Sequence, residues 1–154
     1  MTDHARLAEE LFYKGYNCAQ AVFCAFCDVT GLDTDTAARL SSSFGGGLGR
    51  LREVCGTVSA ASMVLGIVFG YSVPGDMDAK NAHYRLVREF ASTFRERHGS
   101  IVCAQILSGA GIDAGAGGDS SERTAEFYKK RPCAKLVRDA AEIVETMILE
   151  KKER

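Results

Sequence analysis

The stretch FGGGLGRLREVCGTVSAASMVLGIVF, from Phe44 to Phe69, decides the fold of this chain. Its first part places four glycines within five positions, and the backbone entropy that they would lose in a helix predicts a tight loop instead. Its second part, from Val54 to Phe69, is rich in small residues and apolar on all sides, which is typical of a helix buried at the centre of a bundle. We therefore expect a glycine-rich loop followed by a central helix that Gly70 and Pro74 bring to an end.

Helical spacing of apolar residues continues on both sides of this stretch, and no alternating pattern of strand length is present. We expect helices over about 3–12, 17–29, 33–42, 76–98, 101–107 and 133–151, with capping side chains at Asn17, Asp33 and Asp76. The low-complexity segment GAGIDAGAGGDSS, residues 109–121, is expected to be a flexible surface loop. The prediction is an all-α, single-domain bundle of about five to seven helices.

The length and composition of the chain also limit its possible fold and binding partners. A chain of 154 residues fits one domain, here 1–154, and buries roughly 70% of its unfolded surface, so it needs no disulfides for stability. With 19 basic and 20 acidic residues, the net charge of -1 attracts neither nucleic acid nor an anionic membrane. The uncharged segment 54–75 has the length of a membrane span, but glycine, serine and proline interrupt it, so we expect no membrane insertion. The first residues show no secretory signal, and we expect a cytoplasmic protein.

Six cysteines are the unusual feature of the composition, and in a reducing cytosol they favour reactive, metal-bound or buried thiols over structural disulfides. Four of them lie at the start of predicted helices, where free backbone N–H groups and the helix dipole favour a thiolate: Cys18, Cys55, Cys103 and Cys133. The other two, Cys24 and Cys27, are expected in mid-helix, where they pack as small apolar residues.

The glycine-rich loop adds a second argument for Cys55. Arg50 and Arg52 place positive charge just before it, so we expect Cys55 to be the most reactive thiol. The loop does not match the phosphate-binding pattern G-x-x-x-x-G-K-[ST]. Its bare backbone could still approach a ligand or an anion, and the candidate cofactor-binding residues are Gly45, Gly46, Gly47, Gly49 and Arg50.

Helical phase turns Cys18 and Cys133 toward the core, so the four helix-start thiols are expected to converge in space. The alternative, four unrelated buried cysteines, stays open at this point. His83 lies near an apolar stripe and is a candidate ligand or proton shuttle, but we favour a boundary histidine satisfied by hydrogen bonding. His4 and His98 lie near predicted helix ends and are expected to be exposed.

Four stretches resemble a known family: GYNCAQAV (15–22), FGGGLGRLREVCGTVSAA (44–61), REFASTFRERHGSIVC (88–103) and CAKLVRDAAEIV (133–144). They are similar to the C_GCAxxG_C_C family of redox-active proteins with four cysteines. The resemblance implies that Cys18, Cys55, Cys103 and Cys133 are the family's cysteines, and it supplies no reaction. Around the second cysteine the signature reads C-G-A-x-x-G, and this chain has Cys55-Gly56-Thr57-Val58-Ser59-Ala60. Thr57 therefore replaces the alanine and Ala60 replaces the second glycine, while the thiol pattern is intact.

Three interpretations of the function remain. In the first, which we favour, a thiol–disulfide oxidoreductase or electron carrier uses Cys55 as the attacking thiolate and another of the four as its partner, with a redox protein or a small molecule as substrate. In the second, Cys18, Cys55, Cys103 and Cys133 bind an iron–sulfur cluster or zinc, although they lack the paired C-x-x-C spacing of structural zinc sites. In the third, the chain is a helical interaction module with inert cysteines, and its long amphipathic helices suit a homodimer.

Overall fold

A computed structural model describes residues 2–120 and 122–152, and it confirms the all-α prediction. Within these residues no β-strand is formed, and one isolated antiparallel bridge joins Val54 to Val102. The elements along the chain are α1 (His4–Tyr13), α2 (Cys18–Ala25), α3 (Cys27–Thr30), α4 (Thr34–Ser41), the 3₁₀ turn η1 (Ser42–Phe44), α5 (Gly45–Leu48), α6 (Gly56–Phe69), α7 (Met77–His98), α8 (Cys103–Gly109), α9 (Ala125–Lys130) and α10 (Cys133–Lys152).

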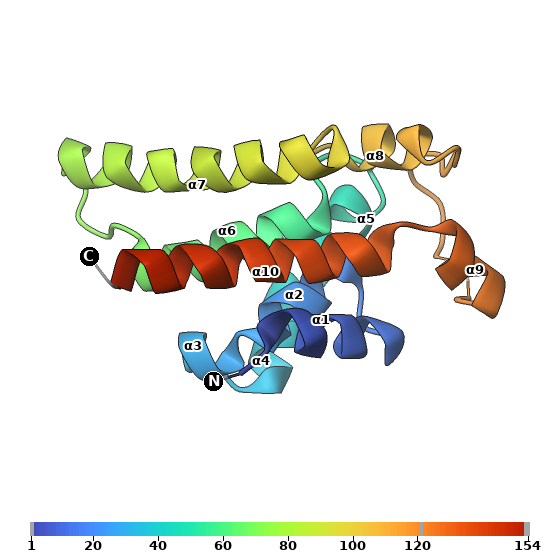
Figure 1. Cartoon of the computed structure of the whole chain (residues 1–154), viewed down its shortest axis with the longest axis horizontal. Helices are drawn as coiled ribbons and strands as arrows, with labels where there is room; N and C mark the ends of the chain where they lie inside the picture. Colours follow the sequence, from blue (N-terminus) through green and yellow to red (C-terminus); the bar gives the residue numbers. More distant parts are fainter. Residues whose placement is uncertain (1, 121, 153–154) are drawn as a thin grey trace.

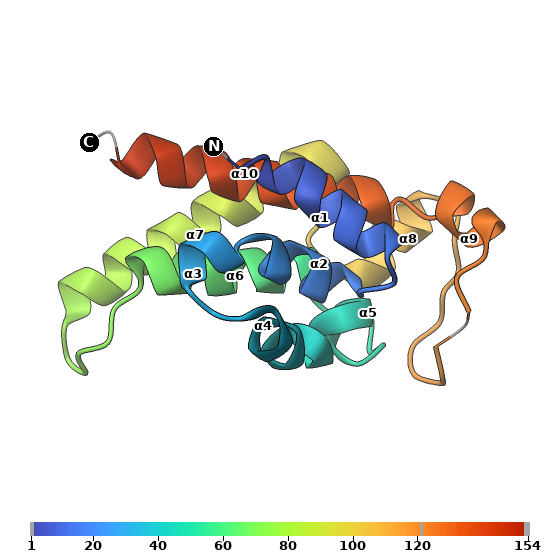
Figure 2. The ribbon, with the colours of Figure 1, turned by 90° about the horizontal axis from the view of Figure 1, so that it is seen from below.

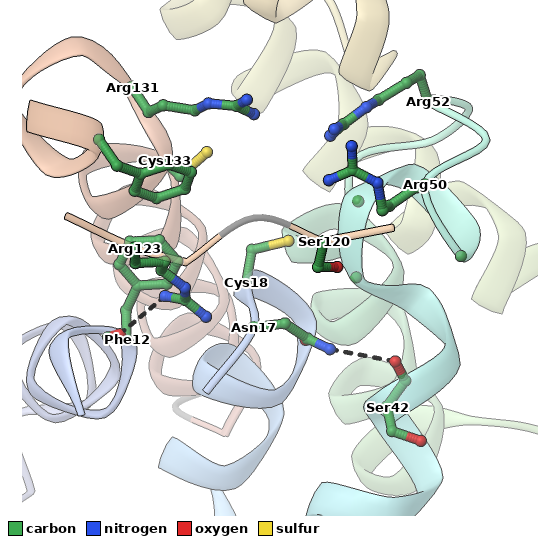
Figure 3. Close-up of a pocket in the computed structure, with 14 residues that line it drawn as sticks. Phe12, Asn17, Cys18, Ser42, Arg50, Arg52, Ser120, Arg123, Arg131 and Cys133 are labelled. Atoms are coloured by element: carbon green, nitrogen blue, oxygen red, sulfur yellow. Dashed lines mark hydrogen bonds between the residues drawn. The ribbon is translucent and has the colours of Figure 1, made fainter. Parts of the chain in front are cut away.

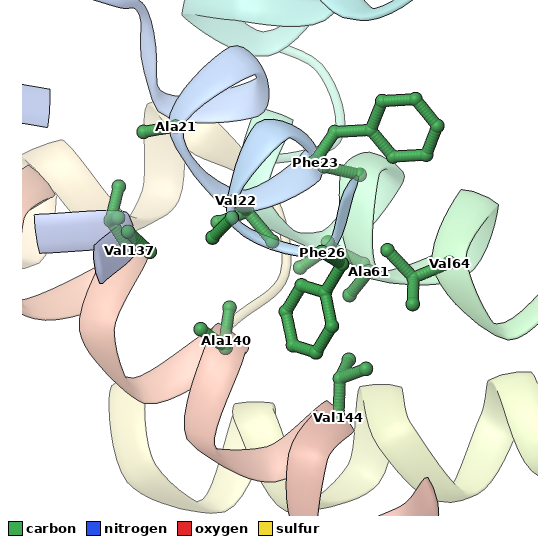
Figure 4. Packing of buried hydrophobic residues seen from close by; sticks show 14 of the residues in the cluster. Ala21, Val22, Phe23, Phe26, Ala61, Val64, Val137, Ala140 and Val144 are labelled. Carbon is green, nitrogen blue, oxygen red and sulfur yellow. The ribbon is translucent and has the colours of Figure 1, made fainter. Parts of the chain in front are cut away.

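The central helix of the bundle is α6, as its all-round apolar sequence predicts. It packs against α2, α7 and α10, and α1 covers the groove between α2 and α10 (Figures 1 and 2). Where α2, α6 and α10 meet, Phe26, Val64 and Val144 are fully buried (Figure 4). Each such side chain contributes about 1.5–3 kcal/mol through burial, so the contact between these three helices holds the site described below in place.

Most helix ends follow from the residues that the sequence marks. The side chain of Asn17 accepts a hydrogen bond from the Gln20 backbone N–H, and the Gln20 side-chain oxygen accepts one from the Asn17 backbone N–H, which closes a capping box at the start of α2. The side chains of Asp33 and Asp76 cap α4 and α7 by accepting hydrogen bonds from the backbone N–H groups of Thr36 and Ala79. Gly99 ends α7 in the left-handed region, at a φ of 82°. These local signals therefore position the first residue of α2, which carries one of the thiols.

The structure departs from the sequence-based helices in the first half of the chain. The expected helix over 17–29 breaks at Phe26, whose fully buried ring is held in the core while the backbone leaves the helical region, and a separate α3 begins at Cys27. The glycine-rich loop is confirmed, because Gly46 and Gly47 have φ values of 67° and 70° inside the turn labelled α5. In the second half of the chain, α9 was not expected, because a helix of six residues is too short to show a stripe of apolar side chains in the sequence.

The exposure predicted for two histidines is wrong, because α10 packs over both. His4 is 6% exposed, stacks on Phe26 and lies 2.7 Å from a carboxylate oxygen of Glu145 in α10. The side chain of His98 is 9% exposed and lies 3.0 Å from Asp139, also in α10. Among the helices of the described residues, none has the length and apolar character needed to cross a membrane.

Candidate functional site

A cavity of about 330 Å³ opens at the end of the bundle where α2, the glycine-rich loop, α9 and the start of α10 meet (Figures 1 and 3). Two thiols and four arginines line it, and none of the lining residues is acidic. Figure 3 shows the guanidinium groups of Arg50, Arg52 and Arg131 turned toward the space beside Cys18 and Cys133. The lining residues are Phe12, Asn17, Cys18, Ser42, Gly45, Gly46, Gly49, Arg50, Arg52, Ser120, Arg123, Phe127, Arg131 and Cys133.

Cys18 is the first residue of α2, and its sulfur faces this cavity (Figure 3). Burial raises the pKa of the thiol above its ordinary value. The backbone N–H groups of Gly46 and Ala19 donate to the sulfur, and Arg123 lies nearby, and these three influences partly offset the rise in pKa. The glycine-rich loop therefore does approach a thiol with its backbone, and that thiol is Cys18.

Backbone hydrogen bonds on either side of the Val54–Val102 bridge join the segments that carry Cys55 and Cys103. The Cys55 N–H donates to the Ile101 carbonyl over 2.8 Å, and the Cys103 N–H donates to the Glu53 carbonyl over 2.6 Å. The two segments are therefore tied together, although they are almost fifty residues apart in the sequence.

The burial of Cys55 does not support the electrostatic argument that made it the most reactive thiol. Cys55 is 4% exposed at the N-cap of α6, and burial raises its pKa far above the ordinary value, while Thr57 at 3.1 Å from the sulfur only partly offsets the rise. The Arg52 backbone is left-handed, with a φ of 62°, and its Nη1 lies 3.7 Å from the sulfur of Cys103. Arg52 is close to Cys55 in the sequence, but its guanidinium group lies beside Cys103.

Cys133 is the first residue of α10 and lines the cavity opposite Cys18. Burial, with smaller contributions from nearby Cys18 and Cys103, raises its pKa to about 12, although Arg131 and Arg123 act in the opposite direction. Cys18 also interacts electrostatically with Cys55 and with Cys103. The structure thus brings Cys18, Cys55, Cys103 and Cys133 together around Cys18.

Glycines make this close packing feasible. A Cβ on Gly56 would lie 2.7 Å from the Cys18 sulfur and 2.7 Å from the Phe44 carbonyl oxygen. A Cβ on Gly47 would lie 2.7 Å from the Cβ of Cys103 and 2.8 Å from the Cα of Arg52. Of the loop residues proposed to bind a cofactor, Gly45, Gly46, Gly49 and Arg50 line the cavity, whereas Gly47 packs against Cys103 instead.

The four arginines come from three segments: Arg50 and Arg52 follow α5, Arg123 precedes α9, and Arg131 lies between α9 and α10. Arg50 Nε donates to the Gly117 carbonyl over 3.2 Å, and Arg52 Nε donates to the Gly115 carbonyl over 3.0 Å. The segment expected to be a surface loop, 109–121, is largely exposed in its described residues, and these contacts join two of its glycines to the arginines; Ser121 lies outside the described residues. Arg123 donates to the carbonyls of three residues near the end of α1: Phe12, Gly15 and Tyr16.

Sequence reasoning missed Arg123 and Arg131 as site residues. A signal for Arg131 was available, because it lies two positions before a helix-start cysteine, much as Arg52 precedes Cys55. No such signal exists for Arg123, whose contact with Phe12 bridges more than one hundred residues of sequence.

Cys24, Cys27 and His83 lie outside this site. Cys24 is buried with its pKa raised to about 11 by burial, and it lines a separate small cavity with the partly exposed Cys27. Cys27 begins α3 and is not in mid-helix as expected. His83 lies in the first half of α7, and the start of that helix is at the opposite end of the bundle from α5 (Figure 1). Its Nδ1 is buried with no hydrogen-bond partner among the described residues, so the prediction of a satisfied histidine is wrong for this nitrogen.

The donor set does not form a ready-made metal site in this conformation. All six cysteines are free, and across 2–120 and 122–152 no three side chains of His, Cys, Asp or Glu lie in an arrangement that could hold a metal ion. The four thiols are close enough to affect one another's pKa, but they do not point at one common ligand position.

The fold and the site define a class of protein: a small all-α bundle in which cysteines at the starts of separate helices meet beside an arginine-lined cavity. The chain belongs to the family described as "Putative redox-active protein (C_GCAxxG_C_C)", whose profile matches residues 16–147 and so contains all four of these cysteines. This match confirms the resemblance seen in the sequence. No curated protein and no solved structure matches the chain.

Proposed function

We propose that this redox-active protein performs thiol–disulfide exchange, with Cys18 as the attacking thiolate and Cys133 as the resolving thiol. The observation that supports the proposal most is that both residues line one cavity and share the guanidinium of Arg123. A substrate disulfide in the cavity can therefore reach both thiols. Cys55 is not assigned the attack, because its buried side chain does not line the cavity.

The two steps balance in atoms and electrons. The Cys18 thiolate attacks one sulfur of a substrate disulfide, the S–S bond of the substrate breaks, and one half leaves as a thiolate with the electron pair. The Cys133 thiolate then attacks the Cys18 sulfur, which forms a Cys18–Cys133 disulfide and releases the second half. The protons lost by the two cysteines are taken up by the two released thiolates. The substrate gains two electrons, the protein loses two, and a reducing dithiol would return the protein to its starting state.

The environment of Cys18 suits the first step. A helix-start position, the Gly46 N–H group and Arg123 all stabilise a thiolate there, although burial keeps most of the thiol protonated at neutral pH. The pKa of Cys133 is also raised, but its attack becomes intramolecular once the mixed disulfide exists, so a high effective concentration compensates for the small thiolate fraction.

Trapping of the mixed disulfide tests the proposal. Cys133→Ser protein treated with 2-hydroxyethyl disulfide should accumulate one adduct at Cys18, found by mass spectrometry of the peptides, whereas wild-type protein should lose two thiols and keep no adduct. Cys27→Ser is the matched control, because it removes a partly exposed cysteine outside the cavity and should behave like the wild type.

Two results would contradict the proposal. One is an adduct that accumulates on another cysteine while Cys18 stays free. The other is one equivalent of zinc or iron bound per chain after anaerobic purification and lost in Cys18→Ser, which would support the metal-binding interpretation.

A further inference from the structure

The charge of the cavity is strongly unbalanced. Four guanidinium groups line it without an acidic lining residue, although the whole chain has a net charge of -1. Within the described residues, no ion pair joins Arg50, Arg52, Arg123 or Arg131 to a carboxylate, so no acidic side chain neutralises their charge at the cavity. Positive charge concentrated in a cleft attracts anions.

Arg52 is the clearest sign that something is missing from this cavity. It is 7% exposed, its Nε and Nη1 are occupied by Gly115 and Cys103, and its Nη2 is buried with no hydrogen-bond partner in the described part of the chain. A buried guanidinium nitrogen without an acceptor is unfavourable, and a ligand oxygen in the cavity would satisfy it.

Arg131 is available on the other side of the cavity. Its guanidinium group stacks 4.9 Å from the centre of the Phe127 ring, which orients it without using its N–H donors, and Figure 3 shows it turned toward Arg52 across the cavity. Planar guanidinium groups bind carboxylate and phosphate oxygens in pairs of parallel hydrogen bonds. Two such groups, Arg52 and Arg131, therefore face the space beside the two thiols.

We infer that the substrate of this site is a compact disulfide that carries anionic groups, carboxylate or phosphate, which Arg52 and Arg131 bind while the disulfide faces Cys18. This inference rests on the proposed thiol–disulfide function and adds the substrate class. A volume of about 330 Å³ is at the lower end of small-molecule sites, which favours a low-molecular-weight disulfide over a protein loop.

Three disulfides of similar length and different charge test the inference: 3,3′-dithiodipropionate (anionic), 2-hydroxyethyl disulfide (neutral) and cystamine (cationic). Each rate of oxidation of the protein is divided by the rate of the same disulfide with free 2-mercaptoethanol, because the leaving thiols differ in pKa. We expect the normalised rate of the anionic disulfide to exceed that of the neutral one by about tenfold or more at low salt, to decrease with added salt, and cystamine to be slowest.

Arg131→Gln should reduce the ratio of the anionic to the neutral normalised rate by about threefold or more, by removal of one charge–charge contact. The matched control is Arg88→Gln, which removes the same charge from an exposed position on α7 and should leave both rates unaltered.

Equal normalised rates for the three disulfides would overturn the inference and leave the proposed function standing. Reaction of none of them at Cys18 would overturn the proposed function, and the substrate class with it. Calorimetry on Cys18→Ser protein identifies the anion: adipate and inorganic phosphate are titrated separately, the preferred one indicates the anionic group of the substrate, and binding of neither would contradict an anion site.

Discussion

Substitution of Gly56 tests the close approach of α2 to α6 on which the thiol site depends. An alanine Cβ there would lie 2.7 Å from the Cys18 sulfur and 2.7 Å from the Phe44 carbonyl oxygen, both too close for real contacts. Overpacking of this kind costs about 1–3 kcal/mol. Alanine in place of glycine stabilises a helix interior by roughly 0.5–1 kcal/mol. Because Gly56 is the first residue of α6, only part of this gain is available to offset the cost of overpacking. We expect Gly56→Ala to lower the free energy of unfolding by about 1–2 kcal/mol.

Gly66→Ala is the matched control, since Gly66 lies in the same helix and a Cβ there would meet nothing within 4 Å. It should raise the free energy of unfolding by about 0.5–1 kcal/mol. Urea unfolding of the two variants and the wild type, with an unchanged dependence on urea concentration, measures both effects. Equal stability of Gly56→Ala and Gly66→Ala would refute the packing of the Cys18 sulfur against α6.

Three further predictions concern the thiols and their surroundings. Because burial raises the pKa of Cys18 and takes that of Cys133 to about 12, their alkylation by iodoacetamide should accelerate with pH to at least pH 9, and a plateau below pH 8 for either peptide would be inconsistent with this. Joint replacement of Cys24 and Cys27 by alanine should lower the free energy of unfolding in urea by about 1 kcal/mol for buried Cys24 and by less for Cys27. Loss of the two-thiol oxidation in this variant would show that Cys24 and Cys27 are the reacting pair. Arg123→Met should destabilise the protein by about 2 kcal/mol, since three backbone carbonyls lose a charged donor, and should slow the alkylation of Cys18; an unchanged unfolding midpoint would show that those hydrogen bonds contribute little.

Local signals predicted most of the helices and the two thiols that line the cavity. Asn17 and the Gln20 three positions later fix the start of α2, and therefore the position of Cys18 at a helix N-terminus. The same reasoning selected Cys133 at the start of α10. These predictions succeeded because a cap acts over three or four residues, within the reach of a sequence pattern.

The electrostatics of the site could not be predicted in the same way, because they depend on tertiary contacts. The left-handed backbone at Arg52 directs its side chain to Cys103 and not to its sequence neighbour Cys55. Arg123 reaches the cavity only because it binds carbonyls near the end of α1. Burial, which dominates the pKa of Cys55, depends on how α2, α6 and α10 pack, and a pattern of residues does not report that packing.

The most direct test of the proposed exchange is the disulfide map of the wild-type protein after reaction with one equivalent of 2-hydroxyethyl disulfide. Digestion at acidic pH, which prevents rearrangement, followed by mass spectrometry identifies the linked peptides. The account predicts that the peptide containing Cys18 is joined to the peptide containing Cys133. A map in which Cys24 is joined to Cys27, or Cys55 to Cys103, with Cys18 and Cys133 still free, would contradict it.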